Sequence, residues 1–406
     1  MQKILLFIAS LFYFNSLFAK DEIKSWQGIH ETPLSRLEQQ FADPPVEFAN
    51  HVIWGWEGKM DKKTICNDLD SIKKKGFRAI IFEAGYKLPF KYLSEEWFKA
   101  IRTGVLEAKK RGMKVWIIDE GKYPSGFAGG KFSQERPDLR MQALVIGDTI
   151  QIKRGEVMTN HKIAPEIISA VAVSTSGAPN RTVAINNGEI SFNAGLDDWK
   201  ILLVKSDFRT AVTRAVNNPN GGKDATNSLC DYLNPVAVQQ FIDWTHEQYK
   251  KYLGKELGTT VLGFRGDEPD YAHLPWTPSI VQTFKDTKGY DPTPYLASFF
   301  TTSPTIQEQR VKADYWDVWS SLFATHFFKL QADWCAANGV AHITHLNKEH
   351  EMPACVKAEG DYFRNLSKVQ IPGVDAIWNQ IWPGTLNDFP KLASSVACLL
   401  YTSPSP

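Results

Sequence analysis

The chain has 406 residues, of which 43% are hydrophobic and 22% are charged, so it can bury a large core and is neither disordered nor fibrous. Its 46 basic and 45 acidic residues give a net charge of +1, which excludes a global field strong enough to draw it to nucleic acid or an anionic membrane. Thirteen Trp and thirteen Tyr exceed what a core usually needs, although core packing explains roughly half of these rings or more.

The first 19 residues have the layout of a bacterial-type secretory signal peptide. Lys3 precedes an apolar run over residues 4–18, and Ala19 is followed by three charged residues. The run is too short for a good membrane anchor, so no stable membrane span is expected. We therefore expect export to the periplasm or the extracellular medium, with the mature chain starting near Lys20.

The next part of the chain alternates between strand-like and helix-like segments. Helices are predicted at residues 61–76 and 95–111, between strands at residues 51–56, 78–84 and 114–120. Both helices carry acidic residues at the start and Lys or Arg before a closing Gly, as helix ends prefer. Consecutive strand and helix units of this kind favour a parallel sheet.

Residues 143–224 change to short runs in which apolar and polar residues alternate. Asn187 and Gly188 separate two such runs, and an Asn-Gly pair is typical of a hairpin turn between short strands. We therefore predict a β-rich insertion after the third strand. It would either wall the mouth of a site or be a purely structural module.

The pattern of helices and strands returns after the insertion. A helix is predicted from Pro235 to residue 254, and a second, longer helix at residues 306–338. Three further strands are predicted, at residues 261–266, 340–345 and 374–377. With six strands in all, we expect an α/β fold, namely a (β/α)8 barrel of the TIM type that is incomplete.

The last nine residues differ from the rest. From Cys398 the sequence becomes a short run that ends in Pro and Ser, to which no packing role can be assigned. We interpret residues 398–406 as a non-native tail, with a Pro-rich linker as the alternative. The expected organisation is then a signal peptide (1–19), a barrel in two parts (41–142 and 225–397) and the β-rich insertion between them.

Strand-like runs in this chain repeatedly end in a carboxylate, and the sharpest case is Asp267 and Glu268 before Pro269. Proline favours an extended backbone at Glu268, which predicts that the two carboxylates point in opposite directions. Glu268 has apolar and aromatic neighbours that favour a protonated carboxyl, as a general acid in glycosidic bond cleavage needs. Asp267 would bind a sugar hydroxyl, orient Glu268 or hold a cation, and a salt bridge with Arg265 is the structural alternative.

A second group follows the third strand, where Asp119 and Glu120 lead into a Gly-rich loop that contains Tyr123 and Ser125. A phosphate cradle is disfavoured, because no Lys-Ser or Lys-Thr pair follows the glycines and acidic residues repel phosphate. We predict that these four residues bind a sugar or a cation. Two further substrate-binding candidates come from the ends of the first two strands, Trp56 and Glu83.

A third group of His and Glu residues follows the fifth strand. It lacks the His-Glu-x-x-His spacing of zinc hydrolases, so a calcium site built from oxygen ligands of several strand ends is easier to form. Surface solvation is an equal alternative for Glu349 and His350. From this part of the chain, the substrate-binding candidates are His345 and Trp378. The metal candidates are Glu351 and Asp375, together with Asp267 from the fourth strand.

Five separated motifs, in this order, resemble the α-L-rhamnosidases of glycoside hydrolase family 106. They are residues 92–98, 119–130, 231–235, 267–269 and 360–375. The resemblance spans about residues 41–397, with little similarity in the β-rich insertion.

The resemblance implies a (β/α) barrel, inverting hydrolysis of terminal α-L-rhamnosyl residues of a plant or microbial polysaccharide, and a calcium ion. It places the general acid at Glu268. An inverting enzyme needs a second carboxylate about 6.5–9.5 Å away as general base. In the family this base lies on a strand after the helix that resembles residues 386–397, where this sequence departs, so we expect the present chain to lack it. A non-catalytic carbohydrate-binding barrel and a barrel glycosidase for another sugar are the alternatives.

Overall fold

The computed structural model describes residues 34–43, 50–121, 123–209, 213–214, 223–224, 228–269, 271, 274–377, 380–381, 383–384 and 388–402. The expected signal peptide lies outside these residues. The chain forms two compact units, Met1–Asn50 and His51–Pro406. Helix α2 (Leu34–Ala42) belongs to the first unit, and everything described below belongs to the second.

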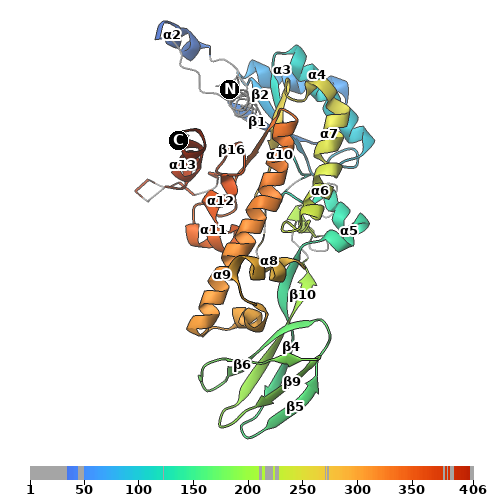
Figure 1. Ribbon diagram of the computed structural model, residues 1–406. Helices are drawn as coiled ribbons and strands as arrows, with labels where there is room; N and C mark the ends of the chain where they lie inside the picture. The colour runs from blue at the N-terminus through green and yellow to red at the C-terminus, as the bar shows by residue number, and fades with distance from the viewer. Residues whose placement is uncertain are drawn as a thin grey trace, which may run out of the picture. The chain divides into compact units, whose positions relative to one another are not determined.

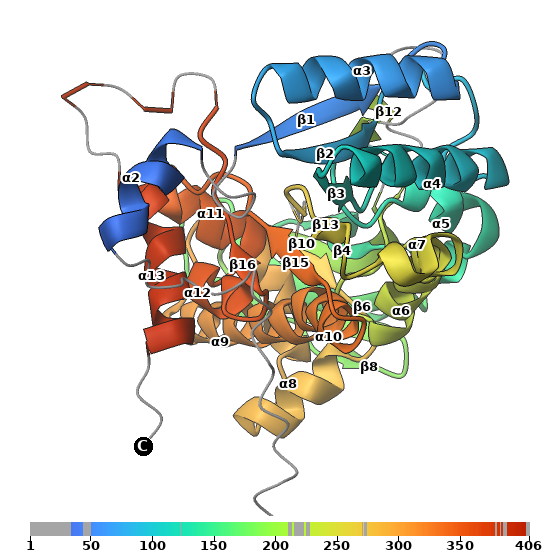
Figure 2. The ribbon, with the colours of Figure 1, turned by 90° about the horizontal axis from the view of Figure 1, so that it is seen from above.

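A six-stranded parallel sheet organises the second unit, in the order β1-β2-β3-β13-β15-β16 (Figures 1 and 2). Its strands are β1 (His51–Trp56), β2 (Ala79–Ala84), β3 (Lys114–Ile118), β13 (Val261–Arg265), β15 (Ala341–Thr344) and β16 (Ile371–Pro372). The predicted parallel sheet is therefore confirmed. The sixth strand lies at residues 371–372 and not at 374–377, which leaves Asp375 beyond the strand end.

Helices α3 (Lys62–Lys74) and α4 (Glu95–Lys110) lie beside the first three strands (Figure 2). Their predicted starts are confirmed, since Asp61 accepts a hydrogen bond from the Thr64 amide at 2.9 Å and Ser94 accepts one from the Trp97 amide at 3.3 Å. The apolar faces of these helices bury a core that includes Ile65, Leu69, Ile80, Phe82, Trp97, Ile101 and Val105.

The two long helices predicted in the second half are both interrupted. Residues 235–253 form α6 (Pro235–Trp244) and α7 (His246–Leu253), because the Thr245 hydroxyl donates to the Phe241 carbonyl and the Thr245 backbone leaves the helical region. The later helix consists of α9 (Ile306–Leu322), a π-helical segment (Phe323–Phe328) and α10 (Lys329–Ala337).

Between β3 and β13 the chain forms short strands, as the alternating pattern of residues 143–224 predicts. They build a larger sheet in the order β14-β4-β10-β6-β7, in which β14 comes from the chain after β13, and a smaller sheet in the order β5-β9-β8. Asn187 and Gly188 both have positive φ between β8 and β9, as the predicted hairpin turn requires. The bounds are β4 (Gln142–Ile152), β5 (Val157–Lys162), β6 (Ile167–Ser174), β7 (Arg181–Thr182), β8 (Ile185–Asn186), β9 (Glu189–Asn193), β10 (Trp199–Phe208) and β14 (Pro275–Trp276).

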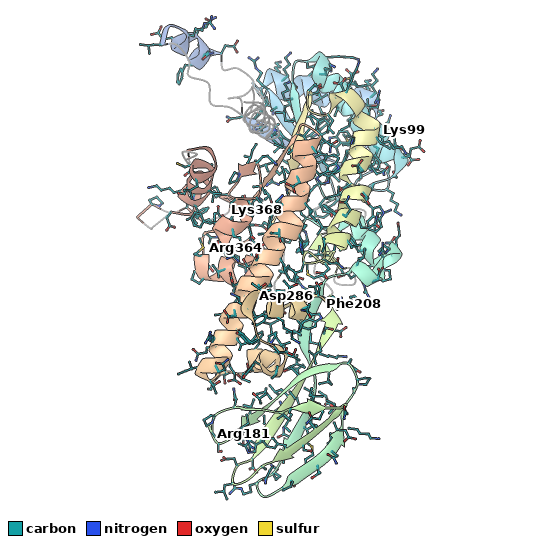
Figure 3. The ribbon with its side chains drawn as sticks, viewed as in Figure 1. Lys99, Arg181, Phe208, Asp286, Arg364 and Lys368 are labelled. Atoms are coloured by element: carbon teal, nitrogen blue, oxygen red, sulfur yellow. The ribbon has the colours of Figure 1, made fainter. Side chains whose placement is uncertain are left out.

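The insertion has its own small core. The guanidinium of Arg181 packs against two rings of this core, at 4.5 Å from the centroid of Phe192 and 5.4 Å from that of Trp199 (Figure 3). Strand β14 belongs to the segment that follows Glu268 and pairs with β4, with Pro275 opposite Ala143. This pairing fixes the insertion to the chain segment that leaves the fourth strand of the parallel sheet.

The remaining elements are short helices and one two-stranded ladder. They are α5 (Lys131–Glu135), β11 (Thr213–Arg214), β12 (Lys223–Asp224), α8 (Ile280–Lys288), α11 (Met352–Glu359), α12 (Tyr362–Leu366), α13 (Phe389–Thr402) and the 3-10 segments 128–130, 137–139, 254–256 and 293–300. Helix α13 continues five residues into the segment interpreted as a tail, and residues 403–406 lie outside the described part. Among the described helices, none has the length and apolar character needed to cross a membrane.

Candidate active site

Most of the candidate residues that the sequence places after strands gather at one edge of the parallel sheet. Asp119 follows β3, Asp267 and Glu268 follow β13, His345 follows β15 and Asp375 follows β16. Because these four strands are parallel neighbours, their carboxyl ends meet at one edge, which is where parallel α/β sheets usually bind their ligands.

His345 is the centre of this group. Its Nε2 lies 3.5 Å from Oδ1 of Asp267, 3.9 Å from Oε1 of Glu268 and 3.8 Å from Oδ2 of Asp375. The side chain is only 4% exposed, and within the described residues this nitrogen makes no hydrogen bond. Burial lowers the pKa of His345 to about 4, against the opposing charge of Asp267, so the imidazole is neutral at pH 7.

Glu268 does not have the extended backbone that the following proline predicts. Its φ is +32°, in the left-handed region that non-glycine residues rarely adopt. Both carboxylates therefore reach the same imidazole, and the prediction that they point in opposite directions is wrong. One residue earlier, both the amide and the carbonyl of Asp267 are hydrogen-bonded to Ser125.

Ser125 holds Asp267 in that position. The Asp267 amide donates to Ser125 Oγ at 2.7 Å, and the Ser125 amide donates to the Asp267 carbonyl at 2.9 Å. The same hydroxyl donates to Oδ1 of Asp119 at 2.7 Å. Ser125 is buried and its hydroxyl is fully engaged, so it joins two strand ends in place of the predicted contact with substrate.

Asp119 is buried beside this hydroxyl. Burial raises its pKa to about 7, the charge of Asp267 adds to the rise, and the bond from Ser125 and the charge of Arg265 oppose it. Its second oxygen, Oδ2, is enclosed and has no hydrogen-bond partner within the described residues. A buried carboxyl with one unsatisfied oxygen retains a proton more readily than an exposed one.

Glu120 has a different role from its neighbour. Its carboxylate accepts hydrogen bonds from the amides of Gly121 at 2.6 Å, Gly129 at 3.0 Å and Ala128. Positive φ values at Ala128 and Gly129 fold the loop around this carboxylate. Glu120 is fully buried, and although burial raises its pKa to about 8, its contacts organise the Gly-rich loop and leave no oxygen for a sugar.

Tyr123 and Glu349 connect the loops around the site. Nδ2 of Asn347 donates to the Tyr123 hydroxyl at 3.1 Å, which links the Gly-rich loop to the segment after β15. Oε1 of Glu349 accepts from the amides of Leu346 at 3.2 Å and Asp375 at 3.3 Å. Glu349 is 2% exposed, so the surface alternative for this residue is wrong; burial raises its pKa to about 8.

The other sequence candidates are not among the contacts described around His345. Trp56 is 0% exposed and packs 5.1 Å from Phe82, between ring centroids, so it is a core residue and offers no ring face to a sugar. Glu83 is half-buried on β2, opposite Gly55. Glu351 is 67% exposed, near His350, and does not reach the carboxylate group. Trp378 lies outside the described residues.

Arg265 is a site residue that the sequence reasoning treated only as a structural partner. Its Nη1 lies 3.8 Å from Oδ1 of Asp267, and its charge lowers the pKa of Asp119 and of His345. Arg265 stands two residues before Asp267 at a strand end. Because alternate residues of an extended strand point to the same face, this spacing was the signal in the sequence that the two side chains lie together. Arg265 is the cation that offsets part of the negative charge here.

Three of these residues could hold a metal ion. Glu268, His345 and Asp375 each offer one ligand atom, and these atoms lie within 4.8 Å of one another. The unsatisfied, buried Nε2 of His345 points into the same space. The carboxylates fit calcium, which prefers oxygen, whereas the imidazole nitrogen is more typical of transition metals.

Comparison with known proteins points to carbohydrate hydrolysis. The sequence profile of the alpha-L-rhamnosidase family matches residues 162–399, which is more than half of the chain. A protein of Formosa agariphila, provisionally named a beta-glucuronidase, is 23% identical over 424 aligned positions that cover 90% of this chain and 34% of that protein.

Among solved structures, a rhamnosidase from Novosphingobium sp. PP1Y is similar, with a TM-score of 0.58 and 15% identity over 84% of this chain and 49% of that one. At this identity the likeness shows a shared fold alone. The chain therefore spans about a third of the curated relative and half of the solved one.

Proposed function

Because the chain belongs to the alpha-L-rhamnosidase family, glycoside hydrolase family 106, we propose that it is an exported glycoside hydrolase that releases terminal α-L-rhamnosyl residues from a polysaccharide. The observation that carries the proposal is the convergence of Asp267, Glu268 and Asp375 on one buried imidazole at the carboxyl ends of parallel strands.

Exposure separates Glu268 from the buried carboxyls of the site, and the family resemblance favours it as general acid over Asp267 and Asp375, which are similarly exposed. Asp119 and Glu349 are enclosed, whereas Glu268 is 22% exposed and can reach a leaving oxygen. Two enclosed carboxyls of the site favour their protonated forms, because burial raises the pKa of Glu349 to about 8 and that of Asp119 to about 7. Glu268 would give its proton to the glycosidic oxygen as the bond to the sugar breaks.

Asp267 and Tyr123 are the partners proposed for sugar hydroxyls. Asp267 is 21% exposed and is fixed by Ser125, and Tyr123 is half-buried at the edge of the same loop. The inverting mechanism needs a water-activating base on the opposite face of the sugar. We keep the family's expectation for that base, on a strand after the helix at residues 386–397, and assign no described residue to it.

A calcium ion is part of the proposal. Asp267 and Asp375 would hold it, since a carboxylate bound to a cation is deprotonated and Glu268 must keep its proton for the leaving group. When bound, the ion would supply positive charge for sugar hydroxyls among carboxylates that otherwise repel one another. His345 would then position the two aspartates from the buried side.

We also propose that the parallel sheet is part of a (β/α)8 barrel, interrupted after its third strand by the insertion at residues 143–224. Two features support this: the strand order follows the chain order throughout, and helices connect successive strands. The segments 41–142 and 225–397 would form the barrel.

A second candidate function is hydrolysis of a different terminal sugar, such as a glucuronide. The name of the Formosa agariphila relative favours it. In that case the same Glu268 would act as acid, and the sugar would be chosen by the residues around it.

One set of assays decides between these functions. The protein is incubated with an aryl α-L-rhamnoside, an aryl β-D-glucuronide and a rhamnose-bearing polysaccharide, and the released sugar is identified. Glu268→Gln keeps the shape of the side chain but cannot donate the proton, so its turnover of the preferred substrate should fall by a factor of about 100 or more. Undiminished turnover by this variant would remove Glu268 from the mechanism.

A further inference from the structure

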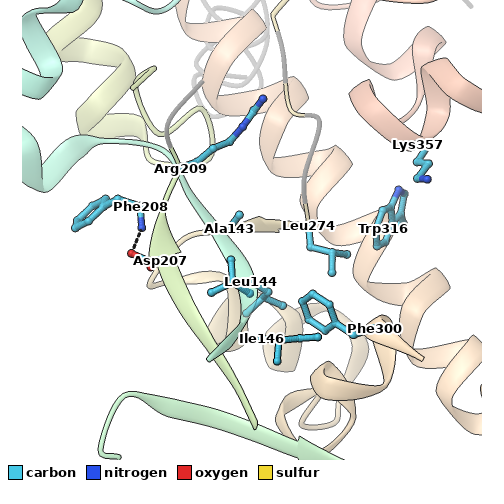
Figure 4. A pocket seen from close by; sticks show the side chains of 11 residues that line it. Ala143, Leu144, Ile146, Asp207, Phe208, Arg209, Leu274, Phe300, Trp316 and Lys357 are labelled. Atoms are coloured by element: carbon cyan, nitrogen blue, oxygen red, sulfur yellow. Dashed lines mark hydrogen bonds between the residues drawn. The ribbon is translucent and has the colours of Figure 1, made fainter. Parts of the chain in front are cut away.

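A cavity separate from the carboxylate group lies where the insertion meets the helices that follow it. Its volume is about 590 Å³, within the range of small-molecule sites, and it is lined by residues of β4, β10, α9 and α11 (Figure 4). Leu274, six residues after Glu268, forms part of its wall, and the Leu144 amide donates to the Leu274 carbonyl at 2.9 Å. A residue close in sequence to the proposed acid therefore lines this cavity.

The floor of the cavity is apolar and aromatic. Leu144, Ile146, Leu274, Phe300 and the indole of Trp316 line it (Figure 4). Flat rings beside aliphatic side chains suit the C–H face of a pyranose ring. A small hydrated anion would gain nothing from such a floor.

The charges of the lining are arranged unevenly. Lys357 stands beside Trp316, whereas Asp207 and Phe208 line the β10 side (Figure 4). Asp207 already accepts a hydrogen bond from the Phe208 amide at 2.8 Å. Arg209, which is 7% exposed, adds a second cation to the lining. Arg209 lies on the β10 side, so Lys357 is the cation beside Trp316 and favours an anionic group at that end of the cavity (Figure 4).

Lys357 differs from the other cations nearby. Arg364 pairs with Asp317 at 2.8 Å, and Lys288 pairs with the same carboxylate at 2.6 Å. Within the part of the chain that the structure describes, Lys357 has no such carboxylate partner. Its ammonium is therefore available to a ligand at the rim of the cavity.

We propose that this cavity binds a hexuronate residue of an acidic glycan, with the sugar ring on Trp316 and Phe300 and the carboxylate at Lys357. The inference rests on the proposed function in one respect: the acidic glycan would be the polysaccharide from which the terminal sugar is removed. The site itself is independent of hydrolysis.

The test is a binding comparison between methyl β-D-glucuronide and methyl β-D-glucoside, which differ only in the carboxylate. Calorimetry or ligand-observed NMR on the intact protein should show about tenfold tighter binding of the glucuronide, as one charge-assisted hydrogen bond provides. Lys357→Met should abolish this preference. Lys312→Met is the matched control, since Lys312 is exposed near Trp316 on the same helix but does not line the cavity.

Trp316→Ala should weaken the binding of both sugars by the same factor, because both share the ring contact. If that variant fails to fold, the exposed Lys357→Met still decides the matter. Equal affinity for the two sugars, no binding of either, or an unchanged preference in Lys357→Met would overturn the proposal. Displacement of the glucuronide by an equal concentration of inorganic phosphate would also overturn it, because the sugar ring would then add nothing.

This experiment separates the two proposals. Binding of the glucuronide without hydrolysis of any glycoside would support the uronate site and overturn the proposed function. Hydrolysis of the rhamnoside without binding of the glucuronide would support the proposed function and overturn the uronate site.

Discussion

Ser125 and Asp267 are joined by two hydrogen bonds of opposite direction, from the Asp267 amide to Ser125 Oγ at 2.7 Å and from the Ser125 amide to the Asp267 carbonyl at 2.9 Å. These residues are 142 positions apart in the chain. Because the Ser125 hydroxyl also donates to Asp119, one side chain sets the separation of the β3 and β13 ends. The geometry of the proposed acid therefore depends on a residue that does not touch substrate.

Ser125→Ala should reduce both stability and turnover. It leaves Oδ1 of Asp119 and the Asp267 amide without their partner, which costs about 2–4 kcal/mol of the free energy of unfolding. Misplacement of Asp267 and Glu268 should lower kcat by about tenfold or more. Urea unfolding and glycoside turnover measure the two effects. Ser176→Ala, an exposed serine of the insertion, is the control, and normal kcat in Ser125→Ala would contradict the positioning role.

Glu349 predicts how stability changes with pH. Its folded-state pKa is raised from 4.5 to about 8 by burial, so as pH rises from about 5 to 8 the unfolded chain loses its proton and the folded chain keeps it. Stability from this group is therefore present at low pH and lost as pH rises through that window. Glu349→Gln keeps an acceptor for the Leu346 and Asp375 amides but does not titrate.

The expected result is a free energy of unfolding that falls less between pH 5 and pH 8 in Glu349→Gln than in the unchanged protein. Asp119 and Glu120 contribute the same trend, since burial raises the pKa of both, so the slope should shrink without vanishing. Urea titrations at the two pH values provide the measurement. Identical slopes for the two proteins would show that Glu349 titrates normally in the folded state.

His345 predicts the opposite trend in acid. Its folded pKa of about 4 lies below the ordinary value of 6.5, so between these values the unfolded chain binds a proton that the folded chain does not. The stability from this group is present above pH 6.5 and is lost as pH falls toward 4. His345→Gln should reduce this loss.

His342 is the matched control for that experiment, because burial also lowers its pKa to about 4 while no carboxylate ion pair involves it within the described residues. His342→Gln should change acid stability in the same way and leave glycoside turnover unchanged. His345→Gln should lower turnover as well. Equal turnover in the two variants would contradict a place for His345 in the site.

Local sequence patterns predicted the strand ends and the hairpin, but not the conformation of the site. Asp119, Asp267 and His345 were found because each directly follows an apolar strand-like run. The turn at Glu268 was missed, because the neighbouring Asp267 is bonded to Ser125, 142 positions away, and no local pattern contains such a contact. The burial of Trp56 has the same kind of cause, since it packs against Trp97 of α4.

The assignment of the metal ligands gives the sharpest test of the site. Glu268 and Asp375 both lie in the group that could hold an ion, yet a cation bound to Glu268 would prevent it from acting as the acid. If Asp267 and Asp375 hold calcium, calcium should raise the Tm of the unchanged protein and of Glu268→Gln alike. At a calcium concentration a hundred times Kd, binding to the folded state adds about 2.7 kcal/mol to the free energy of unfolding.

Asp375→Asn should lose most of this stabilisation. Glu351→Gln, which changes an exposed acid of the neighbouring loop, should keep it. Loss of the calcium effect in Glu268→Gln would make Glu268 a ligand and would require another residue as the acid.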